Sequence, residues 1–339
     1  MMKKIDTYQA IKQEGILLNA NESYKNLSNT ILEEIQEAIG NIDFHRYPED
    51  SCELLCNRYA SYLNLDPNQL IVGNGSDEML GMMIGLSISN HKKLYTVAPD
   101  FSMYDYYVGM HNGDIIKYQN CAEDDFNVDD FINYGKAQDV DMILFSNPNN
   151  PTGKLINQED ICKILTAFKD KYVIVDEAYG EFCESSMISY LDQYDNLLIT
   201  KTLSKAFSLA AIRCGFLIGN SKTIAKIKPY KVPYNVNSLT QCVAEIVLSH
   251  KKEIEADIAY IKRARVKMYK QYLQMKREDL TLFDSHTNFF YGRAKHKENL
   301  LKALQKENII IRDYQDDSFR ITIGSEEENK KVMEVLKNF

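Results

Sequence analysis

Lys205 lies in a segment whose side chains could bind an aldehyde that carries a phosphate. A lysine that loses its proton can condense with an aldehyde to form a Schiff base. Most of the 40 lysine and arginine residues must be solvated surface charges, so only its context distinguishes Lys205. It follows the strand-like apolar run 197–199 and lies in a Ser/Thr-rich stretch that we expect to open a helix. The amides of that helix start could hold a phosphate together with Thr202, Ser204 and Arg213.

Asp176 ends a continuous apolar run, 172–175, which is typical of a central parallel strand. Ligands of open α/β sheets bind at the carboxyl ends of such strands. A carboxylate there could keep a pyridine nitrogen protonated, so that the ring accepts electrons. Taken alone, Asp176 would more simply be a helix cap or a loop acid. Tyr179 and Asn150 change this interpretation, because both can donate a hydrogen bond to a phenolic oxygen on the same ring.

A second candidate phosphate site is the segment 73–78, Gly-Asn-Gly-Ser-Asp-Glu, between a strand-like and a helix-like run. It lacks the third glycine of a dinucleotide fingerprint, and the amides of Gly75, Ser76 and Asp77 at a helix start suit a single phosphate. A glycine turn before a capped helix is common, so the motif is weak by itself. Combined with the segments above, it supplies the groups needed to hold pyridoxal 5'-phosphate.

The order of five motifs resembles that of the fold type I aminotransferases of classes I and II, and most closely the histidinol-phosphate aminotransferases. The motifs are NPNNPTG (147–153), DEAY (176–179), TLSKAF (202–207), RCGF (213–216) and FRIT (319–322). The resemblance extends from Tyr8 and LNANE (18–22) to residue 323. It implies pyridoxal 5'-phosphate as cofactor and a transfer of the amino group of histidinol phosphate to 2-oxoglutarate, as in histidine biosynthesis.

The resemblance also implies a role for each motif residue. Lys205 would form the Schiff base and then move the substrate proton, with Asp176 paired to the ring nitrogen. Tyr179 and Asn150 would contact the phenolic oxygen. The implied phosphate ligands are Gly75, Ser76, Asp77, Thr202, Ser204 and Arg213.

Further implied contacts involve the ring face, the substrate and a second subunit. Phe101 lies where the family usually has a tyrosine against the ring; it keeps the stacking but loses a polar group. From the residues alone, Tyr104 is an equal candidate for that position. Tyr47 would reach the cofactor phosphate of a partner subunit, which implies a homodimer. The implied substrate-binding residues are Tyr8, Asn21, Asn150, Arg312 and Arg320, since arginine forks suit carboxylates and phosphates.

Composition is that of a globular protein with more than one core. A chain of 339 residues is expected to form two domains. The net charge of -8 gives no reason to expect nucleic acid or an anionic membrane as partner. Seven scattered cysteines favour a reducing compartment, and the six histidines form no metal-binding pattern. Without a signal-peptide core or a membrane-length apolar run, we expect a cytoplasmic protein.

The apolar pattern predicts an α/β fold with a mainly parallel, doubly wound sheet and a second, smaller α+β domain. Strands are expected at 70–72, 94–97, 142–145, 172–176, 197–200 and 215–218, and for the small domain at 288–291, 309–311 and 319–323. An amphipathic helix with apolar residues from Ile254 to Met275 should join the domains. We expect an N-terminal segment over 1–39 that joins the small domain and covers the active site, a cofactor-binding domain over 40–240 and a helix with the small domain over 241–339.

Three functions remain open from the sequence. The first is the transamination just described, with a small amine or amino acid and a 2-oxoacid as substrates. The second is a related reaction in the same fold, either decarboxylation of threonine phosphate or transamination of an aromatic amino acid. Which bond at Cα breaks depends on its alignment with the ring, and sequence motifs barely report that angle. The third is a non-catalytic binding module, which the presence of Lys205 disfavours.

Overall fold

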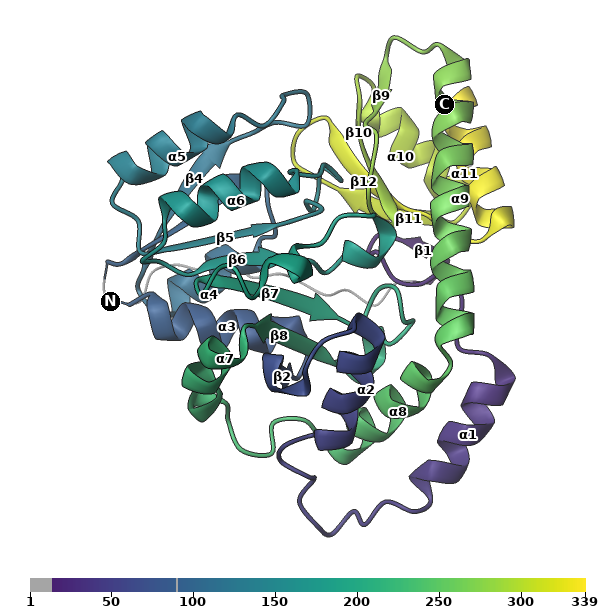
Figure 1. The fold of residues 1–339 in the computed structure, drawn as a ribbon. Helices are drawn as coiled ribbons and strands as arrows, with labels where there is room; N and C mark the ends of the chain where they lie inside the picture. Colours follow the sequence, from purple (N-terminus) through teal and green to yellow (C-terminus); the bar gives the residue numbers. More distant parts are fainter. Residues whose placement is uncertain (1–13, 90) are drawn as a thin grey trace.

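The computed structural model describes residues 14–89 and 91–339, which form a large and a small β-sheet joined by a long helix (Figure 1). The large sheet has the order β2-β8-β7-β6-β5-β3-β4. Only β8 runs antiparallel to its neighbours, so the predicted mainly parallel sheet is confirmed. Its strands are β2 (Leu70–Gly73), β3 (Lys93–Ala98), β4 (Asp114–Gln119), β5 (Met142–Ser146), β6 (Val173–Asp176), β7 (Leu197–Thr202) and β8 (Gly215–Gly219).

Helices cover both faces of the large sheet, which explains why its inner strands are continuous apolar runs. In β6, Val173 and Val175 join the larger core cluster while Ile174 joins the other, and all three are fully buried. The sequence pattern missed β4, an edge strand with no buried residue. The helices of this part are α1 (Asn29–Ile39), α2 (Glu53–Leu63), α3 (Ser76–Ser87), α4 (Met103–Met110), α5 (Val128–Ala137), α6 (Gln158–Ala167), α7 (Ser221–Ile227) and α8 (Ser238–Ser249), with 3-10 turns η1 (Pro67–Gln69), η2 (Gly180–Phe182), η3 (Met187–Tyr190), η4 (Ala210–Ile212) and η5 (Lys228–Tyr230).

The small sheet has the order β1-β11-β12-β10-β9 and includes a strand from near the start of the chain. β1 pairs in parallel with β11, so that Ile16 lies opposite Ile309, and the other pairs are antiparallel. The N-terminal segment therefore packs with elements that are almost 300 residues distant. The elements are β1 (Ile16–Leu18), β9 (Leu280–Leu282), β10 (Phe289–Ala294), β11 (Ile309–Asp313) and β12 (Ser318–Thr322), with α10 (Lys297–Lys306) and α11 (Glu326–Asn338).

The predicted amphipathic helix is α9 (Lys251–Met275), which runs along one side of the molecule in Figure 1. Its buried residues Ile254, Ile258, Ile261 and Met268 recur at helical spacing. Arg265, on the same helix, donates hydrogen bonds to the backbone oxygens of Phe182 (3.0 Å) and Thr287 (2.7 Å). Phe182 ends η2 in the part with the large sheet, and Thr287 lies just before β10 of the small sheet, so this one side chain of α9 bonds to both parts.

The prediction that a helix begins near Lys205 is wrong. Residues 203–209 form bends and turns, followed by η4 and then β8. Only twelve residues separate the end of β7 at Thr202 from the start of the antiparallel β8 at Gly215, so the chain must reverse at once. Ser208 (φ 59°) and Arg213 (φ 55°) adopt left-handed conformations that a helix does not contain. The amide donors of a helix start are supplied by α3 instead.

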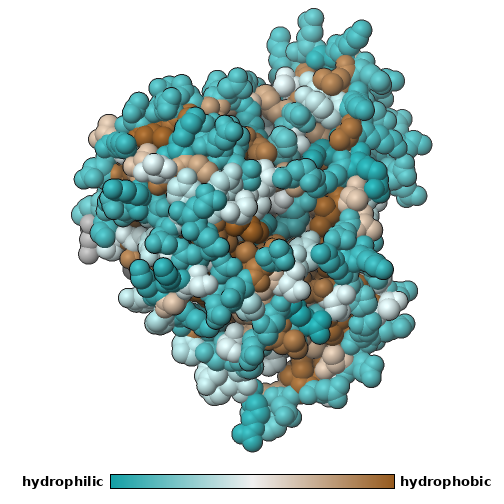
Figure 2. Space-filling model, in the orientation of Figure 1, coloured by the Kyte–Doolittle hydropathy of each residue, from teal (hydrophilic) through white to brown (hydrophobic). Residues whose placement is uncertain are grey.

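The visible surface is mostly hydrophilic, with apolar side chains gathered near the middle of the view and toward its lower part (Figure 2). No helix within the described residues is both long and apolar enough to cross a membrane. In the same part of the chain, no cluster of histidine, cysteine or carboxylate side chains could hold a metal ion.

Candidate active site

The candidate site lies at the carboxyl ends of four neighbouring strands, β3, β5, β6 and β7. Phe101, Asn150 and Lys205 lie in the segments that follow β3, β5 and β7, and Asp176 is the last residue of β6. Parallel strands end at the same edge of a sheet, so residues far apart in sequence meet there. The fold thus brings the separate sequence motifs to one edge.

The start of α3 and the loop after β7 form an anion-binding cradle. Gly75 precedes α3 with a φ of 82°, which favours glycine. Gly215 is required on the opposite side, because a Cβ atom there would lie 2.1 Å from the backbone nitrogen of Ser76. The first amides of α3 are unsatisfied within the helix and carry the positive end of its dipole. The two glycines therefore let β8 approach this helix start closely.

Side chains complete the cradle. Arg213 donates one hydrogen bond to Asp77 (Nη2 to Oδ2, 2.9 Å) and another to Ser204 (Nη1 to Oγ, 3.3 Å). Thr202 in turn donates to Ser204 through their hydroxyls at 2.9 Å. The Arg213 side chain is 44% exposed, so the cradle opens to solvent on this side. These predicted phosphate ligands are therefore connected by hydrogen bonds, in which the Asp77 carboxylate accepts from Arg213.

Asp176 is buried at the end of β6 and held by two hydroxyl donors. Thr200 donates to Oδ1 at 2.8 Å and Tyr104 donates to Oδ2 at 2.9 Å. Burial raises the pKa of Asp176 to about 6, although both hydrogen bonds oppose the shift. A cation beside this carboxylate would stabilise its ionised form, so the position suits a protonated ring nitrogen.

The Lys205 side chain is enclosed, and its amine binds a proton less tightly than that of an ordinary lysine. Its Nζ donates a hydrogen bond to the backbone oxygen of Ala20 at 2.8 Å. Burial, together with the positive charges of Arg320 and Arg213, lowers the pKa of Lys205 to about 8, although Glu22 opposes this shift. A lysine in this environment is partly neutral near physiological pH, which is the form that attacks an aldehyde.

Asn21 connects the N-terminal segment to Tyr179. Its Nδ2 donates to the Tyr179 hydroxyl at 2.9 Å, and its backbone and side chain bond to Thr322 Oγ1 at 3.0 and 3.1 Å. Burial raises the pKa of Tyr179, so the hydroxyl keeps its proton at neutral pH. Tyr179 can therefore donate a hydrogen bond to a ligand while it accepts one from Asn21.

Arg320 reaches from β12 of the small sheet into this group. Its Nη1 donates to Asn150 Oδ1 and its Nη2 donates to the backbone oxygen of Asn19 at 2.9 Å. Its Nε is buried and has no hydrogen-bond partner, and its guanidinium lies over the Phe289 ring at 5.2 Å. A buried charged donor without a partner is costly, which favours an anionic ligand at this point.

The remaining predicted residues differ in how closely they approach this group. Arg312 lies opposite Arg320 in the register of β11 and β12 and is partly buried. Phe101 contacts Tyr104 edge to face, with ring centroids 5.7 Å apart. Tyr47 is 81% exposed and stacks on Tyr234 at 4.7 Å, so it does not join the site of its own chain. Tyr8 lies outside the described residues.

Sequence reasoning missed several residues that support the site. Thr200 and Tyr104 hold Asp176, although Tyr104 was considered only for the ring face. Asp100 and Ser146 form a second polar group beside them. Thr200 could have been found, because it lies two residues before Thr202 on a strand and therefore on the same face. Nothing in the spacing of Tyr104 or Asp100 indicated a partner on another strand.

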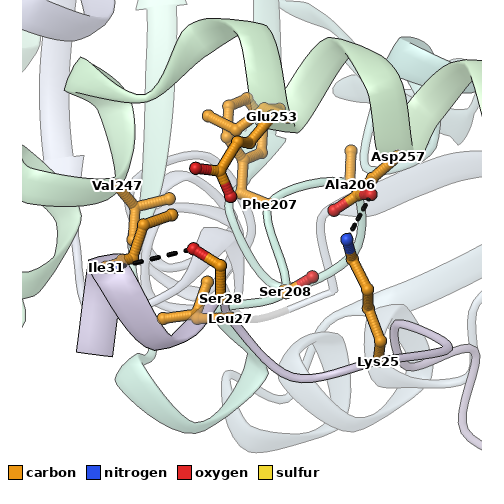
Figure 3. Close-up of a pocket in the computed structure, with 11 residues that line it drawn as sticks. Lys25, Leu27, Ser28, Ile31, Ala206, Phe207, Ser208, Val247, Glu253 and Asp257 are labelled. Carbon is orange, nitrogen blue, oxygen red and sulfur yellow. Dashed lines mark hydrogen bonds and ion pairs between the residues drawn. The ribbon is translucent and has the colours of Figure 1, made fainter. Parts of the chain in front are cut away.

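A small cavity lies beside the loop that follows Lys205 (Figure 3). Its volume is about 20 Å³, enough for roughly one water molecule and far too little for a cofactor. Ala206, Phe207 and Ser208 form one wall. The Lys25–Asp257 ion pair (2.7 Å), which joins the N-terminal segment to α9, closes another. This cavity therefore belongs to the support of the lysine loop.

The donors at the sheet edge match the groups of pyridoxal 5'-phosphate. The cradle at α3 suits its phosphate, Asp176 its ring nitrogen, Asn150 and Tyr179 its phenolic oxygen, and Lys205 its aldehyde. The Nε of Arg320, which has no hydrogen-bond partner, is a cationic donor that could bind an anion.

Comparisons with known proteins agree with this arrangement. The family description "Aminotransferase class I and II" matches residues 13–336. A histidinol-phosphate aminotransferase of Clostridium kluyveri is 37% identical over 325 residues, covering 95% of this chain and 92% of that protein. The crystal structure of the histidinol-phosphate aminotransferase from Clostridium acetobutylicum is similar with a TM-score of 0.83 and 28% identity, covering 95% and 98% of the two chains. L-threonine-O-3-phosphate decarboxylase from Porphyromonas gingivalis shares the fold (TM-score 0.81, 21% identity, covering 96% and 99%).

Proposed function

Since this chain belongs to the class I and II aminotransferases, we propose that it uses pyridoxal 5'-phosphate to transfer the amino group of histidinol phosphate to 2-oxoglutarate. The identity of 37% to a histidinol-phosphate aminotransferase over nearly the whole chain supports this substrate. The observation that carries the proposal is the convergence of a lysine of lowered pKa and a buried arginine that lacks a partner at Nε. The first suits an aldehyde cofactor and the second an anionic substrate.

The bound cofactor would supply a cationic ring that accepts electrons from the substrate α-carbon. Lys205 would hold the cofactor and, once freed by the substrate amine, take the α-proton on Nζ as a general base. Asp176 would keep the ring nitrogen protonated. Asn150 and Tyr179 would orient the ring through its phenolic oxygen.

Arg320 would bind the anion of the substrate. Its Nη1 already contacts Asn150, so one guanidinium joins the substrate-binding end of the site to the ring-binding end. A planar guanidinium can bind either the phosphate of histidinol phosphate or a carboxylate of the 2-oxoacid, because it donates two parallel hydrogen bonds. One site can therefore serve both half-reactions. The substrate roles of Arg312, Asn21 and Tyr8 belong to the same proposal.

We further propose that the active form is a homodimer in which Tyr47 reaches the cofactor phosphate of the partner. Tyr47 and Tyr234 stack on each other while exposed, and other large apolar residues are exposed in the same two chain segments, as is typical of an interaction surface. The other residues are Phe44 (70%), Tyr230 (61%) and Val232 (64%), beside Tyr47 (81%) and Tyr234 (48%) of the pair. Burying them against a second copy would remove this apolar area from water.

The decisive experiment compares two phosphorylated amines. Protein loaded with pyridoxal 5'-phosphate is mixed with histidinol phosphate or with O-phosphothreonine, and the visible spectrum and released carbon dioxide are recorded. We expect histidinol phosphate alone to convert the cofactor to pyridoxamine phosphate. Carbon dioxide from O-phosphothreonine would identify a decarboxylase and overturn the proposed reaction. A purified protein that binds no pyridoxal 5'-phosphate would overturn the cofactor assignment as well.

A further inference from the structure

Asp100 is a polar residue in the interior of the candidate site that the proposed function does not use. It follows β3 and accepts hydrogen bonds from the backbone nitrogens of Phe101 (2.7 Å) and Ser146 (3.1 Å). Ser146 Oγ donates to its Oδ1, and Thr96 Oγ1 lies 3.4 Å from its Oδ2. Four donors thus converge on one carboxylate beside the ring-binding residues.

Ser146 links Asp100 to the turn that contains Asn150 through hydrogen bonds. With its proton donated to Asp100, the Ser146 hydroxyl accepts from the backbone nitrogen of Asn150 at 3.0 Å and from Asn149 Nδ2 at 3.3 Å. Its single donor and both acceptor positions are therefore occupied. If the Asp100 acceptor were lost, the hydroxyl would be free to rotate and the contact to Asn150 would no longer be held in one direction.

The same carboxylate also fixes the start of the Phe101 segment. The backbone nitrogen of Phe101 bonds to Oδ1 of Asp100, and the Phe101 ring packs edge to face on Tyr104. Tyr104 in turn donates to Asp176. Asp100 therefore lies between the Asn150 turn, which the proposed function assigns to the cofactor ring, and Phe101, which the family resemblance places against the face of that ring.

We propose that Asp100 is a positioning residue that aligns Asn150, through Ser146, with the phenolic oxygen of the cofactor. This inference rests on the proposed function, because it concerns the same site. Asp100 does not touch the cofactor in this role and acts only through Ser146. Burial and the nearby charge of Asp176 raise the pKa of Asp100 to about 7, against the effect of its hydrogen bonds, which agrees with an enclosed carboxylate.

The test uses the pH at which the visible absorbance of the bound cofactor changes, because this midpoint depends on the hydrogen bonds to the phenolic oxygen. We compare wild type, D100N, N150A and the double variant, together with the cofactor dissociation constant and the melting temperature. D105N is the matched control, since Asp105 is an exposed aspartate on α4 whose partner is Lys117. We expect D100N to shift the midpoint in the same direction as N150A by about half a pH unit or more, and to weaken cofactor binding several-fold.

The double variant decides between positioning and general support. If Asp100 acts through Asn150, D100N adds nothing to the midpoint shift of N150A, because coupled residues are not additive. A lower melting temperature with an unchanged midpoint, or two shifts that simply add, overturns the inference. If D100N does not fold, S146A provides the same comparison, and an unchanged midpoint there overturns it equally. A wild-type protein that binds no cofactor contradicts the proposed function instead.

Discussion

The amino group of Lys205 donates a hydrogen bond of 2.8 Å to the backbone oxygen of Ala20, across 185 positions of sequence. The residues on either side of Ala20 have similar contacts: the Asn19 oxygen accepts from Arg320, and the Asn21 amide donates to Tyr179. Three consecutive residues of the N-terminal segment thus contact three side chains of the candidate site. This segment forms part of the wall of the site as well as an edge of the small sheet.

The lowered pKa of Lys205 predicts a particular dependence of stability on pH in the apoprotein. Between about pH 8 and the ordinary lysine value near 10.5, the unfolded chain binds a proton that the folded chain does not. The free energy of unfolding should therefore increase with pH across this window. Below pH 8 both states are protonated, and the full cost of burying the ammonium is present.

The measurement compares wild type with K205M by denaturant unfolding at pH 7.5 and pH 10. We expect K205M to be the more stable apoprotein at pH 7.5, with the difference shrinking toward pH 10. K163M serves as control, because the Lys163 ammonium is exposed on α6. A stability difference independent of pH would show that Lys205 has an ordinary pKa.

We expect Arg320 to affect the affinity for the substrate more than the affinity for the cofactor. R320A should raise the KM for histidinol phosphate by about tenfold or more, because a charge-assisted hydrogen bond contributes roughly 1.5–3 kcal/mol. R320K should recover only part of this loss, since lysine keeps the charge but not the planar fork. Steady-state kinetics and a separate cofactor titration distinguish the two effects.

R293A provides the control for the Arg320 variants, because Arg293 forms its ion pairs with Glu123, Asp316 and Asp317. Its KM should be unchanged. Equal losses of substrate and cofactor affinity in R320A would mean that Arg320 supports the whole site and does not bind the substrate anion.

We proposed that Tyr47 contributes to the site of the partner subunit. Mixing two inactive variants tests this proposal. In a mixed dimer of K205A and Y47A, one site combines the intact Lys205 of one subunit with the intact Tyr47 of the other. Random exchange makes half of all dimers mixed, so activity should return to about a quarter of the wild-type value. Activity is followed after the subunits have been dissociated and reassociated, and each variant treated alone serves as the blank. If Y47A loses activity by itself but no activity returns on mixing, Tyr47 acts within its own chain.

Much of the large sheet could be predicted because its strands are buried on both faces. Runs such as 142–145 and 197–200 lie within β5 and β7, and Asp176 was placed correctly at the end of β6. The edge strand β4 has no comparable apolar signal, since its side chains are partly exposed. The short strand β1 was not predicted, because three residues show no period and depend on β11 for their hydrogen bonds.

Errors and omissions at the site had a different cause. The Ser/Thr-rich stretch at Lys205 was predicted to start a helix, whereas the chain needs a tight reversal into β8 there. Local sequence favours a helix start wherever hydroxyl residues follow a strand, and only the antiparallel direction of β8 rules it out. Asp100 and Ser146 were missed because each is an ordinary loop or strand residue until the ends of β3 and β5 lie side by side.

By itself, the sequence indicated which residues carry the chemistry: a lysine, an aspartate at a strand end and a glycine turn before a helix. The local pattern also placed the aspartate and the glycine turn on their elements, but not the lysine. The tertiary structure decided which of these groups meet and with what protonation. Residues 19–21, Tyr104 and Asp100 join the site through contacts across strands or across the chain. The physical reason is that periodicity reports which face of an element is buried, whereas hydrogen-bond partners and pKa shifts depend on what packs against that face.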